Sequence, residues 1–322
     1  MDLCALILAA GKGTRMKSQR PKVLHEILGQ PMLAYILDAV KSLNPCQVVV
    51  VVGHKASEVE KAFADQSLTF VHQSEQLGTG HAVQIALDSL EADRVLITCG
   101  DTPLLSANTL GLLFEEHLRS RASLSFLTAE LADPTGYGRI IRDATGGPQT
   151  IVEEKDASTL EKKVKEVNAG VYIADRDFLR KALESLRPEN AQGEYYLTDI
   201  VAWAASNGFP MATVQLRDPD EMLGVNDRRQ LAHVENILLQ RLRERLMKEG
   251  VTLKMPETIY LEPSVAIEDD VTIWPGAVLR GQTVIHRGAE IGPGAILIDA
   301  LVPEGTRVCP GAIIIGPDSS LC

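Results

Sequence analysis

The segment LILAAGKGTRMKSQRPK, residues 6–22, joins a short apolar run to a loop rich in glycine and cationic side chains. An apolar run of this kind is typical of a strand buried on both faces of a parallel sheet. Gly11 and Gly13 allow backbone N–H groups to face a ligand, and Arg15 and Lys22 add fixed positive charge. The pattern predicts a loop that binds the phosphates of a nucleoside triphosphate; the alternative is a solvated basic turn without chemistry.

Spacing excludes the two best-known phosphate loops. The dinucleotide fingerprint G-x-G-x-x-G has Met16 at its third glycine position, so close packing of a helix on a pyrophosphate is lost. The G-x-x-x-x-G-K-[ST] loop of many nucleotide hydrolases is not present in the sequence either.

Strand-like and helix-like segments alternate through the first two thirds of the chain. Residues 47–53 (QVVVVVG) and 95–101 (VLITCGD) predict buried strands, and residues 31–43 and 81–94 show helical spacing. This order predicts a Rossmann-like, doubly wound α/β domain that binds its ligand outside the carboxyl ends of the strands.

The last third follows a different period. Residues 226–250 predict one long amphipathic helix. From Leu261 to Leu297 apolar residues recur every six positions, and the register resumes at Val302 after a one-residue slip. Such a repeat is typical of a left-handed parallel β-helix, here with about three coils. We therefore expect a nucleotide-binding domain at residues 1–225, a helical arm at 226–250 and a short β-helix at 251–322.

Composition limits the partners. A formal net charge of −11 disfavours nucleic acid and acidic membrane surfaces as partners. Five scattered cysteines without metal-ligand spacing predict free thiols in a reducing compartment. The apolar run Leu3–Ala10 is too short to span a membrane. We expect a cytoplasmic protein without membrane insertion.

Two further segments bear on the site. QLGTGHAVQIAL, residues 76–87, places a glycine-bearing turn at a helix start, where N–H groups are free for hydrogen bonding, and His81 there is expected to be structural. Gly100 and Asp101 end a predicted strand. Asp101 is a candidate Mg²⁺ ligand, because Mg²⁺ prefers one or two protein oxygens plus substrate phosphates. The alternative is that Asp101 caps the turn into Pro103.

Several motifs follow one another in order: LAAGKGTRM, PKVLH, EQLGTGHA, GD, DPTGYGRI, VNAGVY, QGEYYLTDI and GVNDRRQL. Along residues 3–235 the sequence resembles N-acetylglucosamine-1-phosphate uridylyltransferase, a family in which this domain is fused to a β-helix acetyltransferase. The resemblance implies Mg²⁺-dependent transfer of a uridylyl group from UTP to N-acetylglucosamine 1-phosphate.

The same resemblance implies roles for individual residues. Arg15 and Lys22 would be catalytic through the phosphates, and Asp101 and Asn226 would bind Mg²⁺. Asn226 has the alternative role of a helix N-cap. The residues that the resemblance places against substrate are Leu8, Ala9, Ala10, Gly11, Gln73, Gly78, Thr79, Cys99, Gly100, Gly138, Glu153, Asn168, Thr198 and Asn226.

The sequence departs from the family pattern in two regions. Cys99 and Ala169 are smaller than the residues common there, which leaves another hexose 1-phosphate or another base as alternatives. The short β-helix has a single histidine, His286, so we expect no acetyltransferase activity and an assembly role, as a homotrimer. A non-catalytic module that binds a sugar nucleotide and a hexapeptide-repeat acyltransferase are the remaining alternatives.

Overall fold

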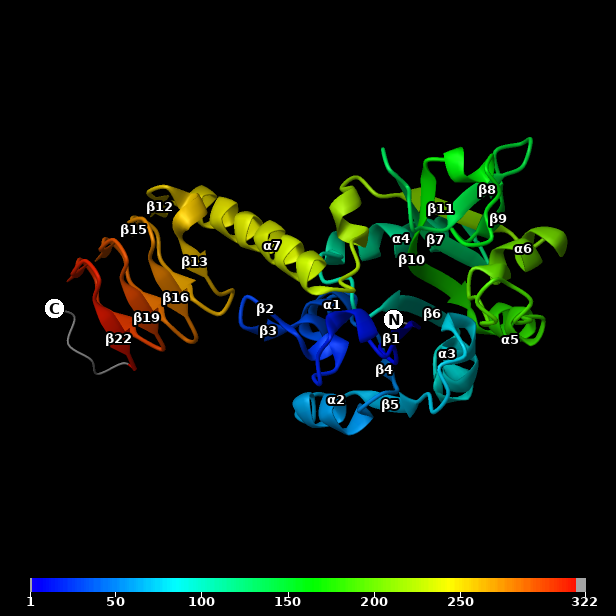
Figure 1. Cartoon of the computed structure of the whole chain (residues 1–322), viewed down its shortest axis with the longest axis horizontal. Helices are drawn as coiled ribbons and strands as arrows, with labels where there is room; N and C mark the ends of the chain where they lie inside the picture. Colours follow the sequence, from blue (N-terminus) through cyan, green and yellow to red (C-terminus); the bar gives the residue numbers. More distant parts are fainter. Residues whose placement is uncertain (1, 317–322) are drawn as a thin grey trace. The chain divides into compact units, whose positions relative to one another are not determined.

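The computed structural model describes residues 2–316, which divide into two compact units (Figure 1). The first unit comprises Met1–His25 and Pro31–Asp227, and the second comprises Glu26–Gln30 and Arg228–Cys322.

A nine-stranded mixed sheet forms the centre of the first unit. Strands β5, β4, β1 and β6 are parallel, whereas β10 runs antiparallel to β6 and β7. Along the main path the order is β11 (Met211–Gln215), β7 (Leu124–Glu130), β10 (Glu166–Asp175), β6 (Arg94–Cys99), β1 (Cys4–Leu8), β4 (Gln47–Val52) and β5 (Thr69–His72). Off this path, β8 (Arg139–Arg142) pairs with β10 and with β9 (Pro148–Val152).

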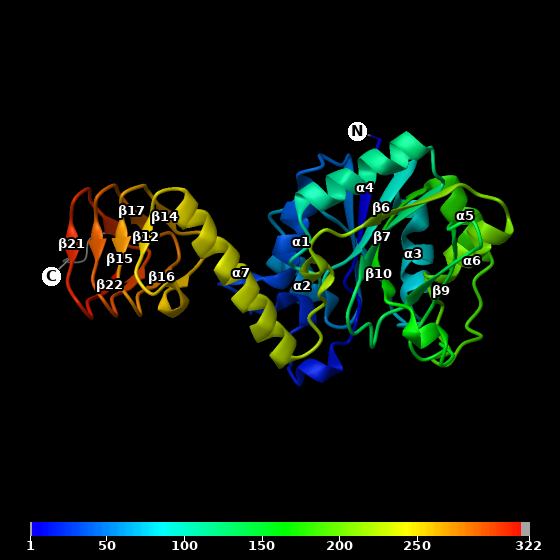
Figure 2. The ribbon, with the colours of Figure 1, turned by 90° about the horizontal axis from the view of Figure 1, so that it is seen from above.

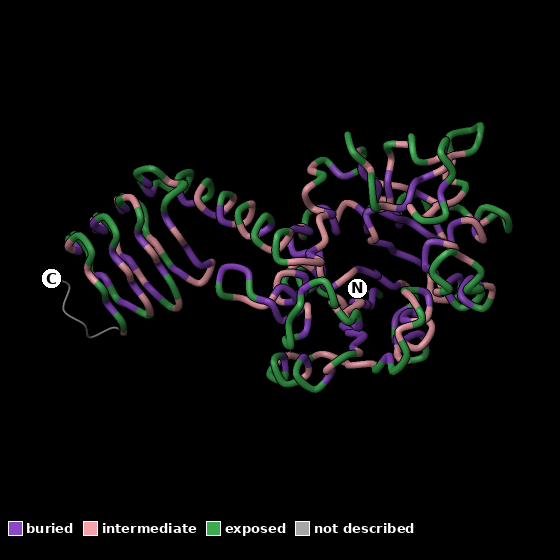
Figure 3. Tube along the Cα trace, viewed as in Figure 1, coloured by how far each residue is buried: buried purple, intermediate pink, exposed green. Residues whose placement is uncertain are grey.

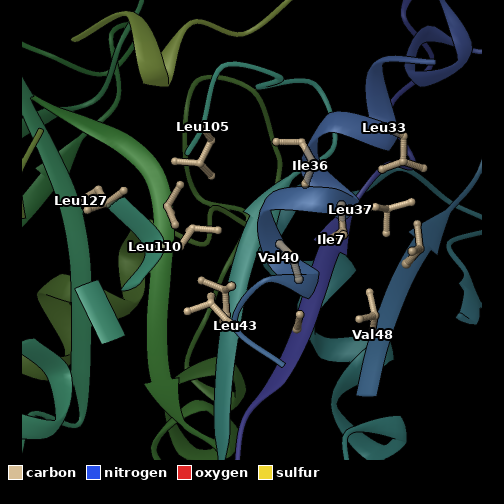
Figure 4. Packing of buried hydrophobic residues seen from close by; sticks show 14 of the residues in the cluster. Ile7, Leu33, Ile36, Leu37, Val40, Leu43, Val48, Leu105, Leu110 and Leu127 are labelled. Carbon is tan, nitrogen blue, oxygen red and sulfur yellow. The ribbon is translucent and has the colours of Figure 1, made fainter. Parts of the chain in front are cut away.

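Helices cover both faces of this sheet, as predicted for a doubly wound domain (Figure 2). Ala5 and Ile7 of β1 pack toward one face and Cys4 and Leu6 toward the other, because side chains alternate along a strand. Figure 4 shows Ile7 packed with Ile36, Leu37 and Val40. One face carries α1 (Met32–Lys41), α2 (Ala56–Ala62) and α4 (Ala107–Ser120), and the other carries α3 (Thr79–Ala86), α5 (Arg176–Glu184) and α6 (Asp199–Ser206). Short 3-10 turns lie at η1 (Thr14–Met16), η2 (Lys22–Leu24), η3 (Leu87–Ser89), η4 (Glu161–Lys163) and η5 (Pro219–Met222).

Two expectations are corrected. The helix predicted for residues 81–94 ends at Ala86, because the chain tightens into η3 and must be extended again where β6 begins at Arg94. The expectation that all cysteines are free is wrong for Cys309, which is disulfide-bonded. Cys4, Cys46 and Cys99 are free thiols as predicted, and Cys322 lies outside the described residues.

The second unit confirms the hexapeptide repeat. Leu261 pairs in register with Leu279, Leu279 with Leu297, and Leu297 with Ile314, so three hexapeptides make each coil and the slip shortens the last one. The strands are β12 (Thr252–Leu253), β13 (Tyr260–Leu261), β14 (Ala266–Ile267), β15 (Thr272–Ile273), β16 (Val278–Arg280), β17 (Val284–Ile285), β18 (Glu290–Ile291), β19 (Ile296–Ile298), β20 (Leu301–Val302), β21 (Arg307–Val308) and β22 (Ile313–Ile315). They form the three parallel sheets of a left-handed β-helix with a buried apolar interior (Figure 3).

The rest of the second unit precedes this β-helix. Helix α7 spans Arg228–Lys248, and η6 (Pro256–Thr258) follows β12. The hairpin β2 (Glu26–Ile27) and β3 (Gln30–Pro31) contacts α7, where Leu28 N donates to Glu235 Oε1 at 3.0 Å. Within residues 2–316, no helix is both long enough and apolar enough to cross a membrane.

A buried histidine makes the stability of the first unit sensitive to acid. His117 is 2% exposed, with Nδ1 2.9 Å from Ser125 Oγ and Nε2 3.6 Å from Asp175 Oδ1. These three residues have the types of a hydrolytic triad, but Ser125 is fully buried, so no substrate can reach it. Burial lowers the pKa of His117, and the attraction of Asp175 only partly opposes this.

We expect the free energy of unfolding to fall as the pH decreases from about 7 through the ordinary histidine pKa of about 6.5. Because the folded pKa is depressed, the unfolded state binds the proton more readily, and protonation therefore favours unfolding. Urea unfolding at several pH values measures the effect. The variant His117→Gln should have lower stability at pH 7.5 and a flatter dependence between pH 7 and 5. An unchanged pH dependence in that variant would assign the acid sensitivity to other groups.

Candidate functional site

The loop after β1 is shaped by a left-handed glycine and an anchoring methionine. Gly13 has φ +59°, and a Cβ there would lie 2.8 Å from Lys22 Cβ, so the loop folds directly against Lys22. Met16 is only 1% exposed and anchors η1 to the core, whereas Thr14 and Arg15 of η1 are exposed. Pro21 precedes η2, which begins at Lys22. The local chain therefore presents the Lys22 ammonium at the carboxyl end of β1.

A cavity of about 520 Å³ lies at the carboxyl ends of β1 and β6. It is formed by the glycine loop, the end of β6 and the start of α3. This position outside the strand ends is the one expected for a ligand in a doubly wound sheet. The sequence-predicted residues that line it are Leu8, Ala9, Ala10, Gly11, Lys22, Gln73, Gly78, Thr79, Cys99 and Asp101.

The start of α3 holds a buried amide against the cavity. Gln73 is 4% exposed, and its Nε2 lies 3.1 Å from the Gly78 carbonyl oxygen and 3.0 Å from His81 Nδ1. A Cβ on Gly78 would lie 2.5 Å from the Tyr195 carbonyl oxygen, so only glycine fits at this turn. His81 thus orients Gln73, which agrees with the structural role expected for it. An oriented amide of this kind can distinguish hydrogen-bond patterns on a base edge.

Three polar side chains meet at the strand-end edge of the cavity. The Lys22 ammonium donates hydrogen bonds to Asp101 Oδ2 and to Asn226 Oδ1, the latter at 3.2 Å. Asp101 and Asn226 are held side by side by a backbone hydrogen bond from Val225 N to the Asp101 carbonyl oxygen at 2.8 Å. A carboxylate and an amide oxygen therefore converge on one cationic group.

The two oxygen atoms of Asp101 and Asn226 can be compared with the ligands that a divalent cation prefers. Mg²⁺ binds oxygen ligands and usually takes only one or two from the protein, with substrate phosphates and water completing its shell. Asp101 Oδ2 and Asn226 Oδ1 are such a pair, and the Lys22 ammonium stands in for the positive charge between them. Among the described residues no group of three or more histidine, cysteine, aspartate or glutamate side chains is placed to hold a metal. The donor set fits a metal that is shared with substrate.

Cys99 and Gly100 form the wall behind this edge. Burial raises the pKa of the Cys99 thiol to about 12, with a further contribution from the Asp101 carboxylate. The thiol is therefore protonated at neutral pH and is a poor nucleophile. Gly100 N donates to the Leu8 carbonyl oxygen at 2.9 Å, and a Cβ on Gly100 would lie 3.3 Å from Ala9 Cβ. Gly100 consequently keeps β6 close to the glycine loop.

Four other predicted residues form a second cluster, which we call the sugar cluster after the substrate that the family resemblance implies for it: Gly138, Glu153, Asn168 and Thr198. Thr198 Oγ1 donates to Glu153 Oε1 at 3.0 Å, and Asn168 N donates to the Gly138 carbonyl oxygen at 2.9 Å. Burial raises the pKa of Glu153, and the nearby Asp199 and Asp156 carboxylates raise it further.

Tyr172 links this cluster to the cavity. Its hydroxyl accepts a hydrogen bond from Asn168 Nδ2 at 2.7 Å. Burial raises the pKa of Tyr172, and the neighbouring Glu153 carboxylate and Cys99 thiol contribute to the same increase. Tyr172, which hydrogen-bonds to Asn168 of the sugar cluster, thus also lies near Cys99, one of the residues that line the cavity.

The structure does not bring every predicted residue to the cavity. Arg15 is exposed on η1 and does not line it. Gly13, which the sequence analysis singled out with Gly11, also lines the cavity. Lining residues that the sequence reasoning did not select are Lys12, Thr14, Val23, Gln76, Ala82 and Glu194. All of them fall inside motifs quoted from the sequence, so the motifs marked this region although the individual residues did not stand out.

A doubly wound domain with a glycine-rich loop at its strand ends is typical of a nucleotidyltransferase, and comparison with known families gives the same class. The family model of the MobA-like NTP transferase domain matches residues 5–161, and that of the bacterial transferase hexapeptide (six repeats) matches residues 264–299. The chain belongs to the GlmU family and is a sugar-1-phosphate nucleotidyltransferase.

Three relatives illustrate the similarity. The bifunctional protein GlmU of Trichlorobacter lovleyi is 48% identical over 313 residues, which cover 96% of this chain and 68% of the relative. That of a Thermus thermophilus strain is 48% identical over 316 residues, covering 97% and 68%. That of Heliobacterium modesticaldum is 44% identical over 322 residues, covering 98% and 70%.

Proposed function

We propose that the chain transfers a uridylyl group from UTP to N-acetylglucosamine 1-phosphate in a Mg²⁺-dependent reaction that yields UDP-N-acetylglucosamine and pyrophosphate. We further propose that it does so in the cytoplasm. The observation that carries the proposal is the convergence of Asp101 and Asn226 on the Lys22 ammonium beside the glycine loop. The family and the ordered motifs support this choice of sugar and base.

The reaction needs positioning and charge neutralisation more than covalent chemistry. A phosphate oxygen of the sugar phosphate attacks the α-phosphorus of UTP in line with the leaving pyrophosphate. When bound, Mg²⁺ offsets the charge of the two phosphates that must approach each other. Asp101 and Asn226 would hold it.

Individual residues of the chain then take the following roles. Lys22 stabilises the charge that develops on the pyrophosphate. The glycine loop directs backbone N–H groups at the phosphates, and Gln73 reads the uracil. Arg15 would assist Lys22 by turning toward the phosphates from its exposed position. The sugar cluster would receive the hexose.

Release of pyrophosphate tests the proposal directly. UTP, dTTP, CTP and GTP are each paired with N-acetylglucosamine 1-phosphate, glucose 1-phosphate and galactose 1-phosphate in the presence of Mg²⁺. We expect the highest kcat/KM for UTP with N-acetylglucosamine 1-phosphate, loss of turnover with a chelator and recovery when Mg²⁺ is restored. A preference for another pair of substrates would keep the reaction but change the proposed base or sugar. If no pair released pyrophosphate, the chain would instead be a non-catalytic module that binds a sugar nucleotide.

We also propose that the β-helix assembles the chain into a homotrimer. Tyr260, Val278, Ile296 and Ile313 are in register on the sheet of β13, β16, β19 and β22, next to the buried leucine row, so they face outward. Ile313 and Ile315 are 67% and 62% exposed. An aligned apolar row of this kind on a polar surface is typical of a protein interface. By contrast, the sheet of β12, β15, β18 and β21 has outward Thr252, Thr272, Glu290 and Arg307.

Light scattering should show a mass of three chains, and Ile296→Asp should reduce it to one, because a buried unpaired carboxylate is costly. The control Thr252→Asp, on the polar sheet, should leave the mass unchanged. A wild-type monomer at micromolar concentration would contradict the proposal.

We propose in addition that residues 251–316 have no acetyltransferase centre of their own. Their one histidine, His286, has Nδ1 3.0 Å from Glu268 Oε1. Arg287 and Asp269 form an exposed ion pair beside it. These contacts are those of a surface ion-pair network. Acetyl-CoA and glucosamine 1-phosphate should therefore release no coenzyme A thiol above background with this 322-residue chain.

A further inference from the structure

We propose that Arg139 is a positioning residue that sets the spacing between Gly138 and Glu153 and thereby the affinity for the sugar phosphate. This inference rests on the proposed function, since it assumes that the sugar cluster receives the hexose. Arg139 is not among the residues that the family resemblance selects.

Arg139 is a buried cation that the fold retains. Arg139 is 1% exposed, and its side chain is among the largest that are fully buried in the described part of the chain. A buried charge is costly unless it is paired, and replacing a buried ion pair by apolar side chains is often neutral or stabilising. Arg139 Nε is buried without a hydrogen-bond partner among the described residues, so the pairing is incomplete. Stability alone therefore does not account for this side chain.

The contacts of Arg139 fall on the immediate neighbours of two sugar-cluster residues. Nη1 donates to the Tyr137 carbonyl oxygen, directly before Gly138. Nη2 donates to Glu154 Oε2 at 2.6 Å, directly after Glu153. Glu154 Oε2 also accepts a hydrogen bond from Gly136 N at 3.2 Å, which closes the bridge between the turn before β8 and the end of β9.

This bridge spans the place where the two cluster residues approach each other. A Cβ on Gly138 would lie 3.5 Å from the Glu153 carboxyl carbon and 2.8 Å from Ile151 Cγ2, so the approach is close and has no slack. The Gly138 carbonyl oxygen in turn accepts from Asn168 N at 2.9 Å. Movement of Gly138 would thus displace Asn168 as well as alter the distance to Glu153.

Arg139 acts through these neighbours and not as a ligand. Its carboxylate partner is Glu154, while Glu153 pairs with Thr198 Oγ1 at 3.0 Å. The Glu153 carboxylate is consequently left to face substrate without competition from the guanidinium. Because misplacement of about 1 Å at a site can cost about 100-fold, loss of the bridge should be measurable.

Arg142 supplies a matched control on the same strand. Its Nε and Nη2 donate to both oxygens of Glu166, at 2.8 and 2.6 Å, and Nη2 lies 3.2 Å from Thr213 Oγ1. None of these contacts falls on a residue adjacent in sequence to the sugar cluster. The variants Arg139→Met and Arg142→Met therefore remove the same kind of ion pair with and without the bridge.

The experiment measures kcat and the KM of each substrate separately for the full chain. We expect Arg139→Met to raise the KM for N-acetylglucosamine 1-phosphate about tenfold or more and to leave the KM for UTP within about twofold. Arg139→Lys should recover part of the loss, because it restores the charge but not the two-pronged geometry. Arg142→Met should leave both KM values within about twofold.

Other outcomes would overturn the inference. Equal increases in both KM values, or no change in either, would remove the positioning role. If Arg139→Met does not fold, as judged by circular dichroism, Glu154→Gln is measured instead. An unchanged KM for the sugar phosphate in that variant would also overturn the inference. Failure of the proposed function is seen separately, as a wild-type chain that releases no pyrophosphate.

Discussion

Replacing Asp101 by alanine should lower turnover by about 100- to 1,000-fold. Asp101 supplies the carboxylate of the oxygen pair that meets at the Lys22 ammonium. Removing it leaves Asn226 as the one protein oxygen of that pair for the cation. Loss of charge neutralisation of about 3–4 kcal/mol in the transition state corresponds to this factor. Initial rates of pyrophosphate release at saturating substrates measure it.

The dependence on Mg²⁺ distinguishes a lost ligand from a disturbed fold. We expect the half-saturating Mg²⁺ concentration to rise at least about tenfold in Asp101→Ala, with an unchanged melting temperature. Asp143 provides the control, because it is exposed and only closes its own turn with Thr145 and Gly147. Near-normal turnover in Asp101→Ala would remove Asp101 from the metal site.

Replacing Lys22 by alanine should lower kcat by a similar factor of about 100 to 1,000 for a different reason. Asp101 and Asn226 hold the ammonium at the edge of the cavity, and in the proposed reaction it passes to the departing pyrophosphate when the cation takes the oxygen pair. A donor aimed at charge that develops in the transition state contributes mainly there, and removing one typically costs about 100- to 1,000-fold in kcat. We therefore expect a larger effect on kcat than on the KM for UTP.

Lys61 is the matched control for this variant, because it is exposed on α2 and its loss changes the net charge by the same amount. Lys61→Ala should keep kcat within about twofold. If Lys22→Ala raised only the KM for UTP, Lys22 would be a ground-state contact and the leaving-group role would be wrong. The two substitutions are also separable, since Lys22→Ala should not raise the half-saturating Mg²⁺ concentration, whereas Asp101→Ala should.

We propose that Lys22 has two roles, one in the free enzyme and one during the reaction. In the structure its ammonium neutralises the oxygen pair, and in the proposed reaction it contacts phosphate. Binding of substrate with its cation would then exchange the partners of Lys22 at no net cost in unpaired charge. This exchange explains why a cationic side chain stands at the edge formed by Asp101 and Asn226.

The β-helix and the position of the glycine loop directly after β1 are the parts of the molecule best predicted from sequence. The six-residue period runs along one continuous stretch of sequence, and each coil of the β-helix packs only on the coils before and after it. The period is therefore sufficient to predict this fold. The glycine loop is likewise predictable from a local pattern, because the strand, the turn and the cationic side chains all lie within residues 6–22. The prediction for helix α3 is too long, because helical spacing continues past Ala86 while the chain tightens into η3 and becomes extended again at β6.

Local sequence patterns were thus sufficient to infer the doubly wound domain, the β-helix and the loop that places Lys22 at a strand end. The contact of Asn226 with Lys22, which is 204 positions away, is seen only in the folded chain, where Val225 N bonds to the Asp101 carbonyl oxygen. The bridge that Arg139 makes between the turn before β8 and the end of β9 is likewise seen only there. The physical reason is that periodicity reports on neighbours along the chain, whereas these contacts depend on how distant segments pair, and such pairing leaves no local pattern.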